Sequence, residues 1–272
     1  MTSAADGGGK PEEATDRRRE PEVEEAFDRL VSEGSNRLAR PLVPLMATGF
    51  VGGIDVGVGV LAYLVVDHQT GQPLLAAAAF PIGFIALLLA RSELFTENFL
   101  VPVMARAAGR GSWLELARLW LVTLAANLAG GLVMAGMIVI GLPELRVTAA
   151  ELGRHYATLG VSWRSLMLAV LAGVVITLLT RMQHAGDALG PKIAAGVAMS
   201  FLLPAAQLFH SVLDSLLMFT GLLGGHAAYT WGDWALALVW SAFGNLVGGI
   251  ALVTSIRLLQ VPHRIAEERT QR

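Results

Sequence analysis

The sequence has no cysteine among its 272 residues, and this absence excludes several kinds of chemistry. Without cysteine the chain forms no disulfide, no thiolate metal site and no cysteine nucleophile. Charge is also scarce: charged residues make up 15% of the chain, and a net charge of -2 gives no reason to expect a nucleic-acid partner. Hydrophobic residues reach 54%, which predicts an all-α polytopic membrane protein with one domain in the lipid bilayer.

The first 38 residues lack an apolar run, so they are neither a signal peptide nor a membrane span. Glycines at 7–9, arginines at 17–19 and many acidic residues predict a charged tail over residues 1–38. Apolar residues then recur at spacings of three and four: Val23, Ala26, Phe27, Leu30 and Val31. This spacing predicts an amphipathic helix on the membrane surface or against the bundle, with a solvated helix as the alternative.

Uncharged runs predict a channel domain of six membrane spans over residues 39–260. The spans cover residues 42–66, 74–106, 119–143, 163–180, 192–223 and 234–256, with a polar loop at 144–162. At about 1.5 Å per residue the first span reaches roughly 37 Å, which is enough to cross a bilayer with some tilt. Residues 261–272 form a short, charged C-terminal tail.

Polar residues interrupt the second and fifth spans, at 91–98 and 207–214. Both interruptions contain Leu-Phe followed by a polar residue, at 94–96 and at 208–210. Backbone that leaves helical geometry inside a membrane survives only within protein or along a watered cavity. The second and fifth helices are therefore predicted to be broken, and the breaks to line a solute path.

A second repeated motif relates the two halves of the chain. Asn-Leu-Ala-Gly-Gly at 127–131 matches Asn-Leu-Val-Gly-Gly at 245–249. Three spans in each half would make the second half enter the membrane from the opposite side, so we expect a 3+3 inverted repeat, an architecture typical of transport proteins. The glycines of these motifs, with Gly244, are expected to let helices approach closely.

The distribution of Lys and Arg predicts the orientation. Sixteen of the 20 fall in the N-terminal tail, after spans two and four, or after span six, and the opposite loops hold Arg146, Arg154 and Arg164. This asymmetry predicts that both termini are cytoplasmic, and hence a multi-pass protein of the cell's inner (cytoplasmic) membrane.

Each break is followed by a half-helix, starting near Thr96 and near Ser211. Two helix starts facing each other would create a positive field that suits a small anion, or a neutral acid about to become one. His210 is the titratable imidazole at this depth, and its alternative role is that of a buried packing residue. Thr96 is expected to offer its hydroxyl to His210 or to the solute, or to serve as an N-cap.

Four charged residues lie at membrane depth: Asp55, Arg91, Glu93 and Asp214. Each costs about 2.5 to 3.5 kcal/mol at the bilayer centre on insertion scales, so internal pairing is expected. Asp214 has the spacing of a capping box with Ser211. Arg91 and Glu93 either fix the first break or stand at the mouth of the cavity, and Asp55 has no evident partner.

These motifs resemble the formate/nitrite transporter family over residues 25–260. The resemblance rests on Glu-Leu-Phe-Thr at 93–96, Phe-His-Ser at 209–211, the two Asn-Leu-x-Gly-Gly motifs and the six-span spacing. The charged tail and the sequence Ser-Glu-Leu-Phe-Thr-Glu-Asn at 92–98 are similar to those of the YfdC-like branch of that family.

The resemblance implies an aquaporin-like bundle assembled as a homopentamer, with one pore per protomer for small monovalent anions and no cofactor. It implies that His210 is the central pore residue, that Leu94, Phe95 and Thr96 form the constriction, and that Asn245 faces the pore. The pore-lining set it suggests is completed by Phe80, Leu203, Phe209 and Ser211. In two places the chain departs from the family: Ala157 stands where a lysine is usual, and Asp214 where a neutral amide is usual.

We therefore expect a non-enzymatic, proton-linked channel or transporter in which an anion takes up a proton and crosses the constriction as a neutral acid. A neutral-solute pore is the nearest alternative, although paired Asn-Pro-Ala motifs are absent. A membrane enzyme using Asp55, Glu93, Asp214 and His210 is disfavoured, because the chain has neither a His-x-x-x-His metal pair nor a serine nucleophile motif. A scaffold without flux, binding a cytosolic partner through its tail, is the remaining alternative.

Overall fold

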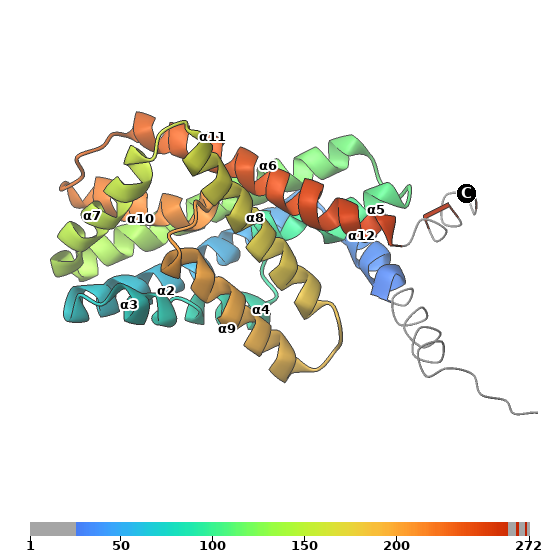
Figure 1. Ribbon diagram of the computed structural model, residues 1–272, viewed down its shortest axis with the longest axis horizontal. Coiled ribbons are helices and arrows are strands. Elements are labelled where there is room, and N and C mark those ends of the chain that lie inside the picture. Colours follow the sequence, from blue (N-terminus) through green and yellow to red (C-terminus); the bar gives the residue numbers. More distant parts are fainter. Residues whose placement is uncertain (1–25, 261–264, 267–269, 271–272) are drawn as a thin grey trace, which may run out of the picture.

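The computed structural model describes residues 26–260, 265–266 and 270, and this part of the chain is helical without any strand (Figure 1). A first helix is described over residues 26–38. The other elements are α2 (Leu42–Thr70), α3 (Pro73–Ala79), α4 (Ile82–Ala90), η1 (Phe95–Phe99), α5 (Val101–Ala107), α6 (Trp113–Gly141), η2 (Pro143–Leu145), α7 (Arg146–Thr158), α8 (Trp163–Gln183), α9 (Leu189–Ala205), α10 (Ser211–Gly224), α11 (Trp231–Leu246), η3 (Val247–Thr254) and α12 (Ser255–Leu259).

Five helical segments are long and apolar enough to cross a membrane. They are Leu42–Thr70, Pro73–Ala90, Trp113–Gly141, Trp163–Gln183 and Trp231–Leu259, and the shorter apolar helices α9 and α10 complete the set. Large apolar side chains on the outside of the bundle, such as Val43, Leu121 and Ile140, are exposed as lipid-facing residues should be. The protein is a multi-pass membrane protein, with helical breaks before η1 and before α10.

The prediction of a polar loop over residues 144–162 is wrong, because most of this segment is helical. One face of α7 is buried: Ala149, Ala150, Gly153 and Tyr156. Their spacing is that of a helix lying on a surface, and this face packs against α10. The small size of three of these residues makes the pattern faint in the sequence.

The helix over residues 26–38 lies against the bundle, and Figure 1 shows it at the same end as α5 and α12. Phe27, Leu30 and Val31 pack with Leu100 and Met104 at the start of α5 and just before it. Of the apolar residues that predicted this helix, Val23 lies outside the described residues, as do residues 1–25 and most of the C-terminal tail.

Glycines bring pairs of helices into backbone contact, as expected from the repeated motifs. A Cβ atom at Gly130 would lie 2.0 Å from the carbonyl oxygen of Phe50 on α2, and one at Gly248 would lie 2.0 Å from that of Val170 on α8. No side chain fits at either distance. The two crossings fix α6 on α2 and η3 on α8 by the same contact.

Candidate functional site

Two breaks in the helices meet inside the bundle. The first begins at Arg91 (φ 53°) and the second at Gln207 (φ 48°); these are the two non-glycine residues with positive φ in the described chain. A left-handed conformation costs an ordinary residue about 1 to 2 kcal/mol, so the surrounding structure must hold both turns in place. After the turns the chain is buried, over residues 92–100 and 208–210.

Asn127 on α6 fixes the first break through three hydrogen bonds. Its Oδ1 accepts from the Phe95 N–H at 2.8 Å, and its Nδ2 donates to the carbonyl oxygens of Gly49 at 2.7 Å and Glu93 at 2.8 Å. Two of the bonded groups, the Phe95 N–H and the Glu93 carbonyl oxygen, lie in the break, where they have no helical partner. The bonds also tie the break to α2.

Asn245 on α11 makes the same three bonds at the second break. Its Oδ1 accepts from the Ser211 N–H at 3.0 Å, and its Nδ2 donates to the carbonyl oxygens of Ala169 and Phe209, both at 2.9 Å. The side chain is fully buried. The family resemblance places Asn245 facing the pore, and here its amide ties the break to α8.

The two sets of bonds correct the alignment of the breaks. Phe95 corresponds to Ser211 and Glu93 to Phe209, each 116 residues apart, and the same separation relates the turns at Arg91 and Gln207. Aligning the two Leu-Phe dipeptides gives 114 and makes Thr96 the partner of His210. That alignment is wrong by two residues, because the dipeptides occupy different positions in the two breaks.

His210 and Thr96 nevertheless touch. His210 Nε2 lies 3.0 Å from Thr96 Oγ1, and both side chains are fully buried. The predicted contact between the imidazole and the hydroxyl is therefore present. It joins the two breaks across the middle of the bundle.

His210 is also the N-cap of α10. Its Nδ1 accepts the Leu213 N–H at 3.1 Å, while its own backbone N–H donates to Asp214 Oδ2 at 2.7 Å. Because Nδ1 accepts a hydrogen bond, we assign the ring proton to Nε2, which then donates to Thr96. The sequence predicted a capping box between Ser211 and Asp214. In the structure His210 occupies the N-cap position instead of Ser211, and Asp214 accepts from the His210 backbone N–H.

Apolar side chains surround the contact between the two breaks. Phe80, Leu94, Phe95, Leu203 and Phe209 are all buried in one hydrophobic cluster. On the side of α7, Tyr156 stacks on Phe209 with ring centroids 6.1 Å apart. A cavity of about 10 Å³ beside these two rings has room for about one water molecule. The predicted constriction residues thus belong to one buried apolar cluster.

A much larger cavity, of about 780 Å³, opens at the first break and forms a vestibule between residues 26–40, the break and the connection from α8 to α9. Charged residues of both signs line it: the basic residues Arg29, Arg37, Arg40, His184 and Lys192, and the acidic residues Glu33, Glu93, Glu97 and Asp187. Apart from Glu93, none of these was among the site residues expected from the sequence. Arg91, an expected cavity-mouth residue, also lines it.

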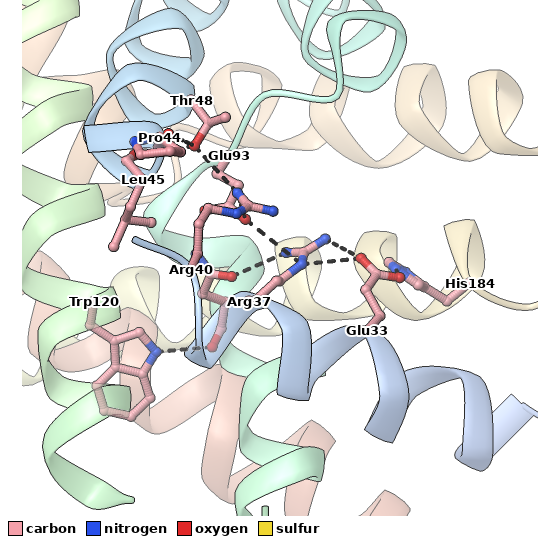
Figure 2. A network of polar contacts seen from close by, with 10 residues as sticks. Glu33, Arg37, Arg40, Pro44, Leu45, Thr48, Glu93, Trp120 and His184 are labelled. Carbon is pink, nitrogen blue, oxygen red and sulfur yellow. Dashed lines mark hydrogen bonds and ion pairs between the residues drawn. The ribbon is translucent and has the colours of Figure 1, made fainter. Parts of the chain in front are cut away.

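A chain of ion pairs crosses the wall of the vestibule (Figure 2). Arg40 Nη1 lies 2.6 Å from Glu93 Oε1, and Arg37 Nε lies 3.9 Å from the same oxygen. Arg37 also pairs with Glu33 at 2.5 Å, and Glu33 accepts from His184 Nε2 at 3.1 Å. Glu93 is therefore bound to the N-terminal helix, and the ion pairs connect the first break to the end of α8.

The hydrogen bond from His184, opposed in part by burial and reinforced by the charge of Arg37, lowers the pKa of Glu33 to about 2. Glu33 is therefore ionised throughout the physiological range. Glu33 and Arg37 are four residues apart on one helix face, which is a signal in the sequence, and Arg40 follows two residues after the helix ends. Their partners Glu93 and His184 are remote in the chain, so the sequence could not supply them.

Asp55, which had no evident partner, accepts a hydrogen bond from the hydroxyl of Ser92. Ser92 lies in the first break, 37 residues further along the chain. The carboxyl group of Asp55 thus helps to hold the first break against α2.

A sequence model described as formate/nitrite transporter matches residues 24–259. The chain is 26% identical to the uncharacterized transporter YrhG of Bacillus subtilis, over 85% of this chain and 90% of that protein. It is 25% identical to the inner membrane protein YfdC of Escherichia coli, over 89% and 80%.

Two solved structures share the fold. An FNT family ion channel superposes with a TM-score of 0.77 at 18% identity, covering 88% of this chain and 99% of that one. A pentameric formate channel with formate bound gives a TM-score of 0.67 at 21% identity, covering 80% and 97%.

Proposed function

The chain belongs to the formate/nitrite transporter family, and from this membership we propose that it carries small monovalent weak-acid anions of the formate and nitrite class across a membrane. It acts as a homopentamer with one conduit per protomer, by analogy with the similar pentameric formate channel. It resides in the inner membrane with both termini in the cytoplasm. The family consists of transporters and channels, so an enzymatic role is not proposed.

The observation that carries the proposal is the contact of His210 with Thr96 inside the apolar cluster. A bare ion in a narrow apolar passage loses most of its hydration, whereas a neutral acid loses far less. Passage is therefore proton-linked at this point. His210 holds the anion by turning its Nε2–H from Thr96 to the solute, and Leu94, Phe95 and Phe209 admit the neutral acid.

The vestibule gives the anion a place to gather before it reaches the constriction. The exposed Arg91 and the half-buried Lys192 supply positive charge there, and they line the same cavity as Arg37 and Arg40. Arg37 and Arg40 are paired with Glu33 and Glu93, which also line the cavity, so their charge is largely compensated.

Labelled formate flux into proteoliposomes tests the proposal, with His210→Asn as the main variant. Asparagine retains the ability to cap α10, so the helix start survives while the imidazole N–H is lost. We expect formate flux to fall by about tenfold or more, as for loss of a hydrogen-bond donor from a buried site. Equal flux in the variant and the wild type would remove His210 from the mechanism.

Glycerol in place of formate distinguishes an anion pathway from a neutral-solute pore. Osmotic recovery of the vesicles with glycerol but not with formate would replace the proposed function by the neutral pore. Absence of flux for every weak acid tested would favour the scaffold. A reporter fused to the C-terminus and found outside the cytoplasm would refute the proposed orientation.

A further inference from the structure

The first turn of α10 carries two buried polar atoms for which the described residues provide no hydrogen-bond partner. They are Ser211 Oγ and Asp214 Oδ1, on side chains that are 1% and 2% exposed. The other oxygen of Asp214 accepts the His210 N–H. Buried polar atoms in a folded protein are nearly always paired, so two orphans one helical turn apart indicate a place for a polar ligand.

The surroundings of Asp214 are uncharged. Tyr63 on α2 and Tyr156 on α7 interact electrostatically with it, and the adjacent His210 is neutral in the tautomer assigned above. From α6 and α11, the other helices that pack on α10, the described residues direct no charged or titratable side chain to it. Tyr156 also lines the small cavity beside Phe209, so it links Asp214 to that side of the constriction.

Energetics favour the neutral acid at this position. Removing a carboxylate from water is costly when no cation accompanies it. The partial positive charge at the start of α10 offsets only part of that cost. The cost is larger than the gain, so the carboxyl group keeps its proton, and its orphan Oδ1 is the atom that carries it.

We propose that Asp214 is the residue that protonates the transported anion, and that its Oδ1–H and the Ser211 hydroxyl form the subsite where a monocarboxylate or nitrite binds. This inference rests on the proposed function and supplies its proton. In the step the O–H bond of Asp214 breaks and an O–H bond to the anion forms, leaving a carboxylate and a neutral acid. The acid crosses the constriction, and hydronium from the solvent on the α7 side restores the Asp214 proton.

The geometry assigns this step to Asp214 rather than His210. Both ring nitrogens of His210 are engaged, with Nδ1 accepting from Leu213 and Nε2 directed at Thr96. A second ring proton would have to enter at Nδ1, where it would oppose the Leu213 N–H and remove the cap. Oδ1 of Asp214 gains or loses a proton without breaking any hydrogen bond that the structure contains.

Simultaneous measurement of formate uptake and luminal pH in proteoliposomes tests the proposal. The wild type should move protons with formate and be insensitive to membrane potential. Asp214→Asn has the shape of the neutral acid and keeps an acceptor for the His210 N–H, so it should assemble normally. We expect its proton-coupled flux to fall about a hundredfold or more, as for loss of a general acid, with any remaining formate flux sensitive to potential.

Two further variants separate proton transfer from a structural role. Asp214→Glu restores a carboxylic acid and should recover proton coupling. Asp55→Asn, at a buried carboxyl bonded to Ser92, should leave the ratio of protons to formate unchanged. Asp214→Asn with the wild-type ratio would overturn the inference and leave the proposed function intact. A wild type that carries no weak acid would instead refute the proposed function.

Infrared difference spectra of the wild type give a readout that needs no variant. Formate binding should perturb the band of a protonated carboxylic acid. Spectra without any change in the carboxylic-acid region would overturn the inference even if both Asp214 variants failed to assemble.

Discussion

Replacing Arg40 with methionine tests whether a buried ion pair fixes the N-terminal helix to the first break. Arg40 Nη1 lies 2.6 Å from Glu93 Oε1, and Glu93 is 3% exposed while Arg40 is 28% exposed. Methionine keeps an unbranched apolar stem and removes the charge. The carboxylate of Glu93 then keeps only the more distant Arg37, at 3.9 Å.

The size of the effect follows from the burial of Glu93. Two unit charges at this separation attract by about 6 kcal/mol at an effective dielectric constant of about 20, and by about 1.6 kcal/mol in water. Desolvation offsets much of this attraction, but a deletion leaves the desolvated partner behind, which typically costs 3 to 5 kcal/mol. Since Arg37 remains and Arg40 is partly exposed, we expect a loss near the lower limit, about 3 kcal/mol.

Unfolding in mixed micelles with increasing SDS measures the free energy, and the fluorescence of Trp120 reports on the region. Trp120 Nε1 donates to the Asn98 carbonyl oxygen at the first break, as Figure 2 shows. The double variant Arg40→Met with Glu93→Gln removes both charges and should be more stable than Arg40→Met alone. Arg154→Met, at an exposed site on α7, should stay within about 0.5 kcal/mol of the wild type. Additive effects of the two substitutions, or an Arg40→Met variant as stable as the wild type, would refute the reasoning.

Two further predictions concern the breaks and the N-terminal helix. Asn127→Leu and Asn245→Leu each leave two buried backbone groups of a break unpaired, so each should lower the free energy of unfolding in mixed micelles by about 2 kcal/mol or more; a large loss in one and none in the other would contradict their equivalence. Because the pKa of Glu33 falls from 4.5 to about 2 on folding, its contribution to docking of the N-terminal helix is complete above about pH 5 and lost as the pH falls towards 2. Hydrogen exchange over residues 26–38 should accelerate in that window in the wild type, and Glu33→Gln should show fast exchange already at neutral pH.

The sequence predicted the five long apolar helices because uncharged runs have a direct physical cause in the bilayer, whereas the six-span inverted repeat stays a prediction. The second and fifth spans are broken where the polar residues predicted, around Glu93 and His210. The helix α7 was missed because its buried face is built mainly from alanine and glycine, which give little contrast with a loop. Hydrophobic contrast identifies an element only when the buried residues are large.

Pairings between remote residues were the part of the site that sequence could not supply. Ser92 bonds Asp55, and His184 bonds Glu33 across 151 residues, yet no spacing rule relates either pair. The contact of Thr96 with His210 was expected for the wrong reason, because the two residues are not equivalent in the repeat. They touch because the two breaks cross at this point.

The two breaks have matching backbone hydrogen bonds to an asparagine but differ in their charged residues. Asn127 and Asn245 make matching bonds, whereas Glu93 of the first break corresponds to Phe209 of the second. The first break binds its carboxylate to arginines at an open vestibule. The second buries Asp214 without a cation, next to Tyr156, which lines a cavity of about 10 Å³. The two sides of the constriction therefore differ: ion pairs line the vestibule, and a carboxyl group without a cation lies towards α7. The proposed proton transfer belongs to the α7 side, where an anion can be protonated before it enters the constriction.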